Sequence, residues 1–213
     1  MKNINKLSKI VAASLGTVAT LGMLPQAAAE TVSLQATVDV LNTFTLAQSS
    51  QINFGTLRAK ASTDSANTAF VTLSANAATN ASTGTTVGAN NTDVPGVTVL
   101  TAGAPGTYAV TGAANFTALQ ISVDADSVNL TGSGIPPGKP TYLQMGSLRV
   151  RDTAGTETPL NTTGTTLPTI GDGSLTFTVG GTLTTQDNAD LALTDGNYAD
   201  GTYAGSLVLT VTY

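Results

Sequence analysis

The decisive stretch of this sequence is Leu207-Val208-Leu209-Thr210-Val211-Thr212-Tyr213, which has a leucine, valine or tyrosine at every second position. Side chains of a strand point alternately to the two faces of a sheet, so this spacing predicts a strand with one apolar face. A second stretch, Val32-Ser33-Leu34-Gln35-Ala36-Thr37-Val38-Asp39-Val40, alternates in the same way. An apolar strand left as an exposed edge promotes aggregation, so we expect the strand at 207–213 to be well buried.

Shorter runs between these two stretches also favour strands, because they are rich in valine, isoleucine, tyrosine and threonine and lack a helical period. Turn pairs such as Pro105-Gly106, Asp172-Gly173 and Asp195-Gly196 separate them. About ten short strands with polar turns predict an all-β fold, an antiparallel β-sandwich. The runs are Ile52–Phe54, Phe70–Leu73, Val97–Leu100, Tyr108–Val110, Leu119–Val123, Val128–Leu130, Tyr142–Val150 and Leu175–Val179.

We expect residues 43–213 to form a single domain, preceded by an N-terminal strand at 30–42. The segment 74–95 is rich in alanine, asparagine, threonine and glycine, which predicts a long surface loop or a flexible insert. Residues 152–172 show a weaker version of the same pattern. The pair Gly180-Gly181 stands between two threonine-rich strand pieces and indicates a β-bulge or a kink.

The N-terminal residues 1–29 have the pattern of a secretory signal peptide. Three lysines precede the apolar stretch Ile10–Leu24, and Ala27-Ala28-Ala29 supplies the small residues of a cleavage site. A membrane anchor is the alternative, but this apolar stretch is shorter than the ~20 residues that a spanning helix needs. We therefore expect an exported protein without membrane insertion. Loss of the three lysines would change the formal net charge from −5 to −8.

The composition excludes several kinds of chemistry. The chain has no histidine and no cysteine, which removes the commonest general base and the thiolate ligands of zinc. Asp124 and Asp126 could form a carboxylate pair, but their place at a strand end is better explained by turn chemistry. We therefore predict a protein that is not an enzyme and needs no cofactor. Few basic residues and a pI of about 4.3 argue against nucleic acid as a partner.

Calcium is the one metal for which the sequence offers candidate ligands. Asp187, Asp190, Asp195 and Asp200 lie close together in a segment rich in asparagine and glycine, and carboxylate oxygens are what Ca²⁺ binds. Their spacing matches neither an EF-hand loop nor a calcium-binding nonapeptide repeat, and Asp-Gly is also a common turn pair. We therefore interpret them as solvated turns and as weak calcium candidates.

Three segments together carry a resemblance: Ile52-Asn53-Phe54-Gly55-Thr56-Leu57, then Ser174–Leu183, and finally Gly201–Tyr213. They resemble a family of exported bacterial domains of unknown function. That family is similar in turn to the spore-coat-protein-U-like pilins of archaic chaperone–usher systems. The resemblance covers most of residues 34–213. The chain departs from such pilins in lacking their cysteine pair and in ending on the aromatic residue itself.

The resemblance implies an immunoglobulin-like sandwich that lacks its last strand and is completed in trans by the N-terminal strand of the next subunit. The donor residues would be Val32, Leu34, Ala36, Val38 and Val40. The acceptor strand would carry Gly201, Leu207, Leu209, Val211 and Tyr213. The implied partners are further copies of the chain, a periplasmic chaperone and an outer-membrane usher. The implied location is the periplasm in transit and then the cell surface, in a pilus or fimbria.

The residues themselves leave two functions open, because the alternation at 32–40 suits both. In the first, this strand completes a neighbouring copy and the protein is a structural subunit of a surface fibre. In the second, the strand belongs to its own domain. The protein is then a self-complete secreted adhesin or biofilm-matrix protein that binds a surface carbohydrate or protein.

Overall fold

The computed structural model describes residues 43–63, 67–79, 81–86, 93–187 and 193–213. This part of the chain contains strands and loops but no helix, and so no helix that could cross a membrane. It belongs to one compact unit, Leu41–Tyr213. The predicted all-β class is therefore confirmed. The signal peptide expected at 1–29 and the strand expected at 30–42 lie outside the described residues.

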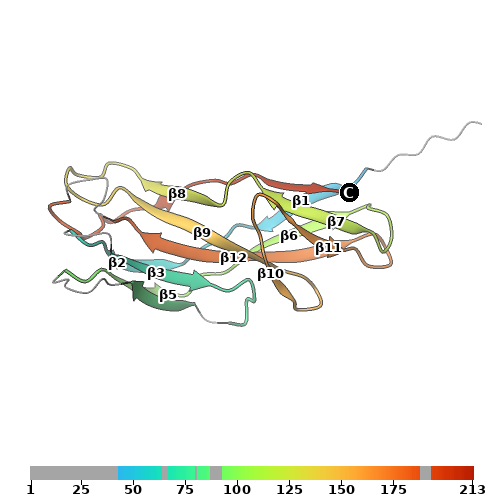
Figure 1. Cartoon of the computed structure of the whole chain (residues 1–213), viewed down its shortest axis with the longest axis horizontal. Coiled ribbons are helices and arrows are strands. Elements are labelled where there is room, and N and C mark those ends of the chain that lie inside the picture. Colours follow the sequence, from blue (N-terminus) through green and yellow to red (C-terminus); the bar gives the residue numbers. More distant parts are fainter. Residues whose placement is uncertain (1–42, 64–66, 80, 87–92, 188–192) are drawn as a thin grey trace, which may run out of the picture. The chain divides into compact units, whose positions relative to one another are not determined.

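The strands pair in an antiparallel manner throughout the described ranges (Figure 1). They are β1 (Thr45–Ser50), β2 (Thr56–Lys60), β3 (Thr68–Leu73), β4 (Ser82–Thr86), β5 (Gly96–Thr101), β6 (Gly106–Thr111), β7 (Ala118–Val123), β8 (Ser127–Gly132), β9 (Tyr142–Arg151), β10 (Glu157–Pro159), β11 (Thr165–Pro168), β12 (Leu175–Thr185), β13 (Tyr203–Ala204) and β14 (Leu209–Thr212).

The largest sheet has the strand order β1-β6-β12-β9-β8-β13, with β3 and β4 extending from β12 and β10 extending from β9. Two smaller sheets have the orders β11-β7-β14 and β2-β5. The strands at the two ends of the main path, β1 and β13, line the same groove. The sheet therefore curls into a half-barrel rather than lying flat.

Two long ribbons of paired chain connect the large sheet to the smaller sheets. The pair β1–β6 continues into β2–β5 through Asn53 and Ala104, whose backbone amides donate to each other's carbonyl oxygens at 2.9 and 2.7 Å. The pair β8–β13 continues into β7–β14 past Asp124 and Val208. There the Asp124 amide donates to the Val208 carbonyl, and the Val208 amide donates to the Asp124 carboxylate. Each ribbon is thus held by hydrogen bonds at the point where it changes sheet, in the second ribbon with the help of the Asp124 side chain.

The central strand β12 changes its partner on one edge at Gly180. Residues Leu175–Val179 pair with β6, whereas Gly181–Thr184 pair with β3. The end of β3 passes so close that a Cβ at Gly180 would lie 2.3 Å from the carbonyl oxygen of Leu73. Only glycine leaves room for this backbone crossing.

On its other edge β12 faces a β-bulge. Gly180 pairs with Arg149 and Thr182 pairs with Gly146, so two residues of β9 stand opposite Gly181 alone. The bulge predicted at Gly180-Gly181 is therefore confirmed, although the extra residue belongs to β9. One of the two, Ser147, has a positive φ of 48°, which is typical of a strained bulge position.

The core follows from the alternation in the sequence. Leu119, Ile121 and Val123 of β7 are buried, while the residues between them are exposed or half-buried. The same alternation buries one face of β3, β9 and β12. The largest fully buried apolar side chains are Phe177, Leu119, Ile121, Leu175, Val71, Val110 and Val150. Apolar burial of this kind supplies most of the driving force for folding.

The structure differs from the sequence-based expectation within 74–95 and 152–172. Residues Ser82–Thr86 form β4, and Ala75 is fully buried, so 74–95 is not one continuous surface loop. Strands β10 and β11 lie within 152–172. That part of 74–95 is flexible stays a prediction.

The C-terminal run is also less regular than expected. Gly205–Val208 lies outside any strand, so the run is divided into β13 on the large sheet and β14 on the three-stranded sheet. The expectation of a well-buried strand is wrong: β14 is an edge strand whose apolar residues are half-buried, and Tyr213 is 47% exposed. Its free edge forms part of the site described next.

Candidate functional site

A groove of about 1000 Å³ separates the first and the last strands of the domain. One wall is β1 with the following residues Gln51–Phe54, together with Tyr108 of β6. The opposite wall is Thr202–Leu207 with Leu209, the stretch drawn in red in Figure 1. Within the described residues, β1 pairs only with β6, β13 only with β8 and β14 only with β7. Both walls therefore present strand edges with backbone groups available for pairing.

The floor of the groove is the hydrophobic core itself. Its side chains come from β7, β8, β9 and β12 and from the residue after β10: Val123, Leu130, Met145, Leu148, Leu160 and Val179. All six belong to the core cluster or pack against it. The groove therefore reaches the core between two strand edges.

Tyr108 brings a polar hydroxyl group to the wall formed by β1. Its ring stacks on Phe177 at 5.4 Å, and its hydroxyl accepts a hydrogen bond from Gln48 Nε2 at 3.5 Å. Burial raises the pKa of Tyr108 above its ordinary value, so the phenol stays protonated at physiological pH. The sequence indicates Tyr108 only as part of the strand run Tyr108–Val110, and it gives no signal for Gln48. Leu46, which also lines the groove, continues the apolar parity of the 32–40 stretch.

The Asn-Phe-Gly-Thr motif at 53–56 builds the bend of the same wall. The Asn53 carboxamide accepts a hydrogen bond from the Gly55 amide at 2.7 Å, and Gly55 has φ of 82°. A Cβ at Gly55 would lie 2.0 Å from the Thr101 carbonyl oxygen. The motif therefore makes a tight turn against the β5–β6 connection, and it places the buried ring of Phe54 in the groove.

The predicted acceptor residues lie in or near the second wall. Leu207 and Leu209 line the groove, and together with Val211 they pack against the core. Tyr213 lies beyond it, with its ring edge-on to Phe44 at 5.4 Å and its hydroxyl accepting a hydrogen bond from the Ala114 amide. Gly201, at φ of 154°, immediately precedes the wall. The predicted donor residues Val32, Leu34, Ala36, Val38 and Val40 lie outside the described residues.

Three of the four calcium candidates, Asp187, Asp195 and Asp200, lie in the described part of the chain, where no group of three or more acidic side chains is placed to hold a metal ion. The Asp195 carboxylate pairs with Lys139 Nζ at 2.6 Å and accepts hydrogen bonds from the amide and side chain of Asn197. These contacts lower the pKa of Asp195 to about 2, the hydrogen bond from Lys139 contributing most. Asp190 lies outside the described residues. Calcium binding stays untested.

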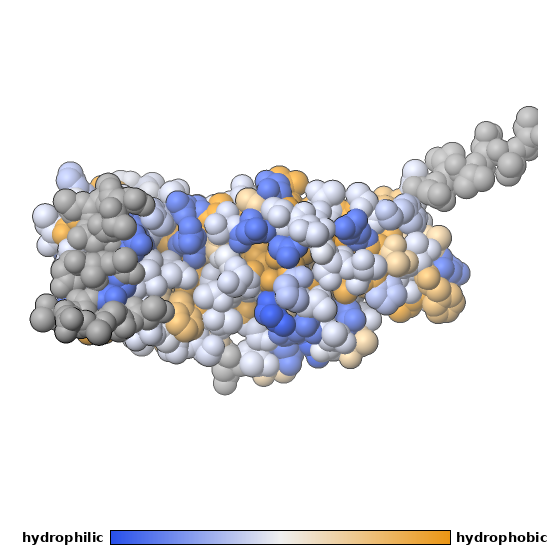
Figure 2. All heavy atoms as spheres, viewed as in Figure 1, coloured by the Kyte–Doolittle hydropathy of each residue, from blue (hydrophilic) through white to orange (hydrophobic). Residues whose placement is uncertain are grey.

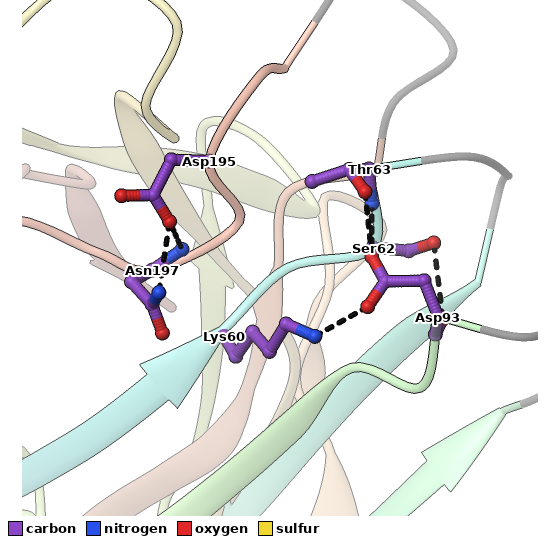
Figure 3. A network of polar contacts seen from close by, with 6 residues as sticks. All are labelled: Lys60, Ser62, Thr63, Asp93, Asp195 and Asn197. Carbon is purple, nitrogen blue, oxygen red and sulfur yellow. Dashed lines mark hydrogen bonds and ion pairs between the residues drawn. The ribbon is translucent and has the colours of Figure 1, made fainter.

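A second ion pair adjoins this loop (Figure 3). Lys60 pairs with Asp93, whose carboxylate also accepts hydrogen bonds from the amide and hydroxyl of Thr63. The pKa of Asp93 falls to about 2, chiefly through the Lys60 hydrogen bond. A backbone bridge between Lys60 and Asn197 joins the two ion pairs. These two ion pairs and their hydrogen bonds hold neighbouring loops in place, which is a structural role.

The carboxylates of Asp124 and Asp126 serve separate loops. Asp124 accepts a hydrogen bond from the Val208 amide, and Asp126 accepts one from the Thr162 amide, each at 2.9 Å. Both bonds join residues far apart in the sequence, so they differ from the local turn chemistry expected at this strand end. The groove is therefore the strongest candidate for a functional site in the described part of the chain.

Comparison of the chain with protein-family models, with curated proteins and with solved structures gives no match.

Proposed function

We propose that this protein is a structural subunit of a bacterial surface fibre, a pilus or fimbria, in which the 31–41 segment of one copy fills the groove of the next. The carrying observation is the groove itself, which lies between two strand edges over an apolar floor. A strand placed there would pair with backbone on both sides. The resulting domain would be an immunoglobulin-like sandwich completed in trans.

The chemistry of the 31–41 segment supports this assignment. In an extended strand one face would carry Val32, Leu34, Ala36, Val38 and Val40, and that face would meet the groove floor of Leu130, Met145 and other apolar side chains. Each valine or leucine fully buried in this way contributes about 1.5–3 kcal/mol. The backbone hydrogen bonds fix the position of the strand, and the apolar side chains fix its register.

This mechanism joins assembly to folding. A domain with an open groove reaches its full core only when a strand enters, so the completed contact should dissociate slowly. Copies of the chain are therefore the main partners. A periplasmic chaperone that holds the groove during export and an outer-membrane usher are further proposed partners, in line with the family resemblance. The proposed location is the periplasm and then the cell surface, and the proposed role is non-enzymatic.

The test is removal of the donor segment. Deleting 31–41 should leave a soluble or chaperone-bound monomer that forms no fibres in electron micrographs and elutes as a single small species in size-exclusion chromatography. A chain that keeps the segment's length and composition in scrambled order is the matched control, and it should fail in the same way. Normal polymerisation of either chain would contradict the donor assignment.

The alternative is a self-complete adhesin or matrix protein in which the same segment fills its own groove. It predicts a stable monomer that never polymerises, even with the segment intact. The two functions therefore differ in whether the strand in the groove comes from the same chain or from another chain.

A further inference from the structure

Four apolar side chains gather at one end of the domain, and we name this surface the end face: Phe44, Phe116, Ile170 and Tyr213. Phe116 is 80% exposed, Ile170 50% and Tyr213 47%. Phe44 contacts the ring of Tyr213. Figure 2 shows hydrophobic colouring gathered at an end of the molecule. Exposed apolar clusters of this kind are typical of interaction surfaces.

The end face is held together by backbone hydrogen bonds between two loops. The Ala113 amide donates to the Gly173 carbonyl at 3.1 Å, and the Phe116 amide donates to the Ile170 carbonyl at 3.3 Å. Thr169 adds a bond in which its amide donates to the Thr117 carbonyl at 2.8 Å. The surface is thus preorganised, which lowers the entropy cost of docking.

Phe116 adopts an unusual backbone conformation, with a positive φ of 53°. A bulky residue rarely adopts this conformation, because its Cβ crowds the following peptide. The strain keeps a large ring at the surface, where it gains nothing from the core. Such strain is concentrated at sites that bind something.

The sequence next to the end face indicates what binds there. The 31–41 segment ends three residues before Phe44, and three residues of extended chain span about 10 Å. If 31–41 occupies the groove of a neighbouring copy, the surface around Phe44 must lie within that distance of the neighbour. The tether also gives the second contact a high effective concentration.

Charge favours the same occupant. After loss of the signal lysines each copy carries a formal net charge of −8, so copies repel one another over most of their surface. The four residues of the end face carry no charge. A contact there buries aromatic area and brings few like charges together, with Asp172 as the one acidic residue of the 169–173 loop.

We infer that the end face packs against the neighbouring copy of this chain, next to the groove that holds the donor segment. This inference rests on the proposed function and adds a second interface to it. The donor strand supplies the lasting connection, and the end face restricts the angle between successive subunits.

Because the chain has no cysteine, a single introduced cysteine can carry a photo-crosslinker at one known position. The test uses the full chain with Phe116→Cys, labelled with benzophenone maleimide and illuminated after assembly. Leu100→Cys is the matched control, since Leu100 is also apolar and 56% exposed but lies on β5. We expect at least five times more cross-linked dimer from position 116 than from position 100. Equal yields would overturn the inference.

A third labelled chain, Asp39→Cys, separates this inference from the proposed function, because residue 39 would lie on the face of the donor segment that points away from the groove floor. Dimers from position 39 with no excess from position 116 would overturn the end-face contact and leave the donor strand intact. Dimers from position 116 with none from position 39 would contradict the proposed function instead. Mass spectrometry of the position-116 adduct then identifies the surface of the neighbour that it meets.

Discussion

Gly180 shows how a single hydrogen atom in place of a side chain allows the central strand to change partners. The backbone of Leu73–Ala75 passes over it, with the Leu73 carbonyl oxygen 2.3 Å and the Ala75 nitrogen 2.5 Å from where a Cβ would stand. Backbone atoms at this distance must move, unlike the end of a flexible side chain. The glycine pair was noticed in the sequence, but the crossing strand that requires it depends on contacts between distant segments.

We predict that Gly180→Ala lowers the free energy of unfolding by about 1–3 kcal/mol, because the added methyl group overpacks the crossing. The matched control is Gly96→Ala on β5, where a built Cβ meets nothing within 4 Å and the change should be within about 0.5 kcal/mol. Urea unfolding of both variants beside the unchanged protein provides the measurement. Equal stability of the two variants would contradict the crossing.

The pKa values of Asp93 and Asp195 predict how stability depends on pH. Both fall from the ordinary 3.8 to about 2 in the folded protein, so their contribution is present above pH 3.8 and is lost as the pH falls towards 2. The chain has no histidine or cysteine, so we expect a nearly constant unfolding free energy between pH 5 and 8.

Urea unfolding at a series of pH values checks this prediction. The variant Asp93→Asn/Asp195→Asn should lose less stability between pH 4 and pH 2 than the unchanged protein does. An equally steep loss in the variant would show that the two ion pairs do not govern the acid limb.

At the scale of elements, the sequence predicts strands well where large side chains alternate. Runs such as Leu119–Val123 and Leu175–Val179 lie within β7 and β12. The strand predicted at Ile52–Phe54 is wrong, because this run contains only an isolated bridge at Asn53. The sequence misses β4, whose residues Ser82–Thr86 have no apolar side chain. That strand is held by backbone pairing with β3, and Gly84 leaves room for the ring of Phe70. The alternation of apolar residues therefore cannot predict a strand such as β4, which forms only because it pairs with β3.

The division of the C-terminal run could not be predicted for a related reason. Gly205 lies against β8, where a Cβ would stand 2.7 Å from the Asn129 carbonyl oxygen, and Val208 is held by Asp124. These contacts depend on how β7 and β8 themselves bend between sheets. Of the predicted acceptor residues, Leu207 and Leu209 line the groove, and their role as acceptors stays a prediction.

The parity of the donor strand gives a prediction at this scale. Val38→Asn would put a polar amide on the apolar floor, which costs about 1–3 kcal/mol without a new hydrogen bond. It should therefore reduce fibre formation about 5- to 150-fold. Asp39→Asn, one residue further along and on the opposite face, should assemble as the unchanged chain does. Quantitative electron microscopy or light scattering measures both. Similar losses from the two variants would contradict a one-sided strand.

At the scale of the whole molecule, the large sheet curls until its first and last strands border one groove. The alternating pattern at 32–40 predicts a strand that needs a sheet, and the groove presents two strand edges. The sequence could not show that place, because the floor residues Met145, Leu148 and Leu160 look like ordinary core residues until the sheet is built. Neither could it show the end face, where Phe116 and Ile170 are brought together by two loops.

In the proposed function, the strand in the groove comes from a neighbouring copy and not from the same chain. The chain has no cysteine, so Ala36→Cys combined with Gln48→Cys gives one thiol on the donor segment and one on the groove wall. After treatment with a short bis-maleimide cross-linker, donation between copies predicts a ladder of covalent dimers, trimers and longer species on a denaturing gel. A product confined to internally cross-linked monomer would contradict it.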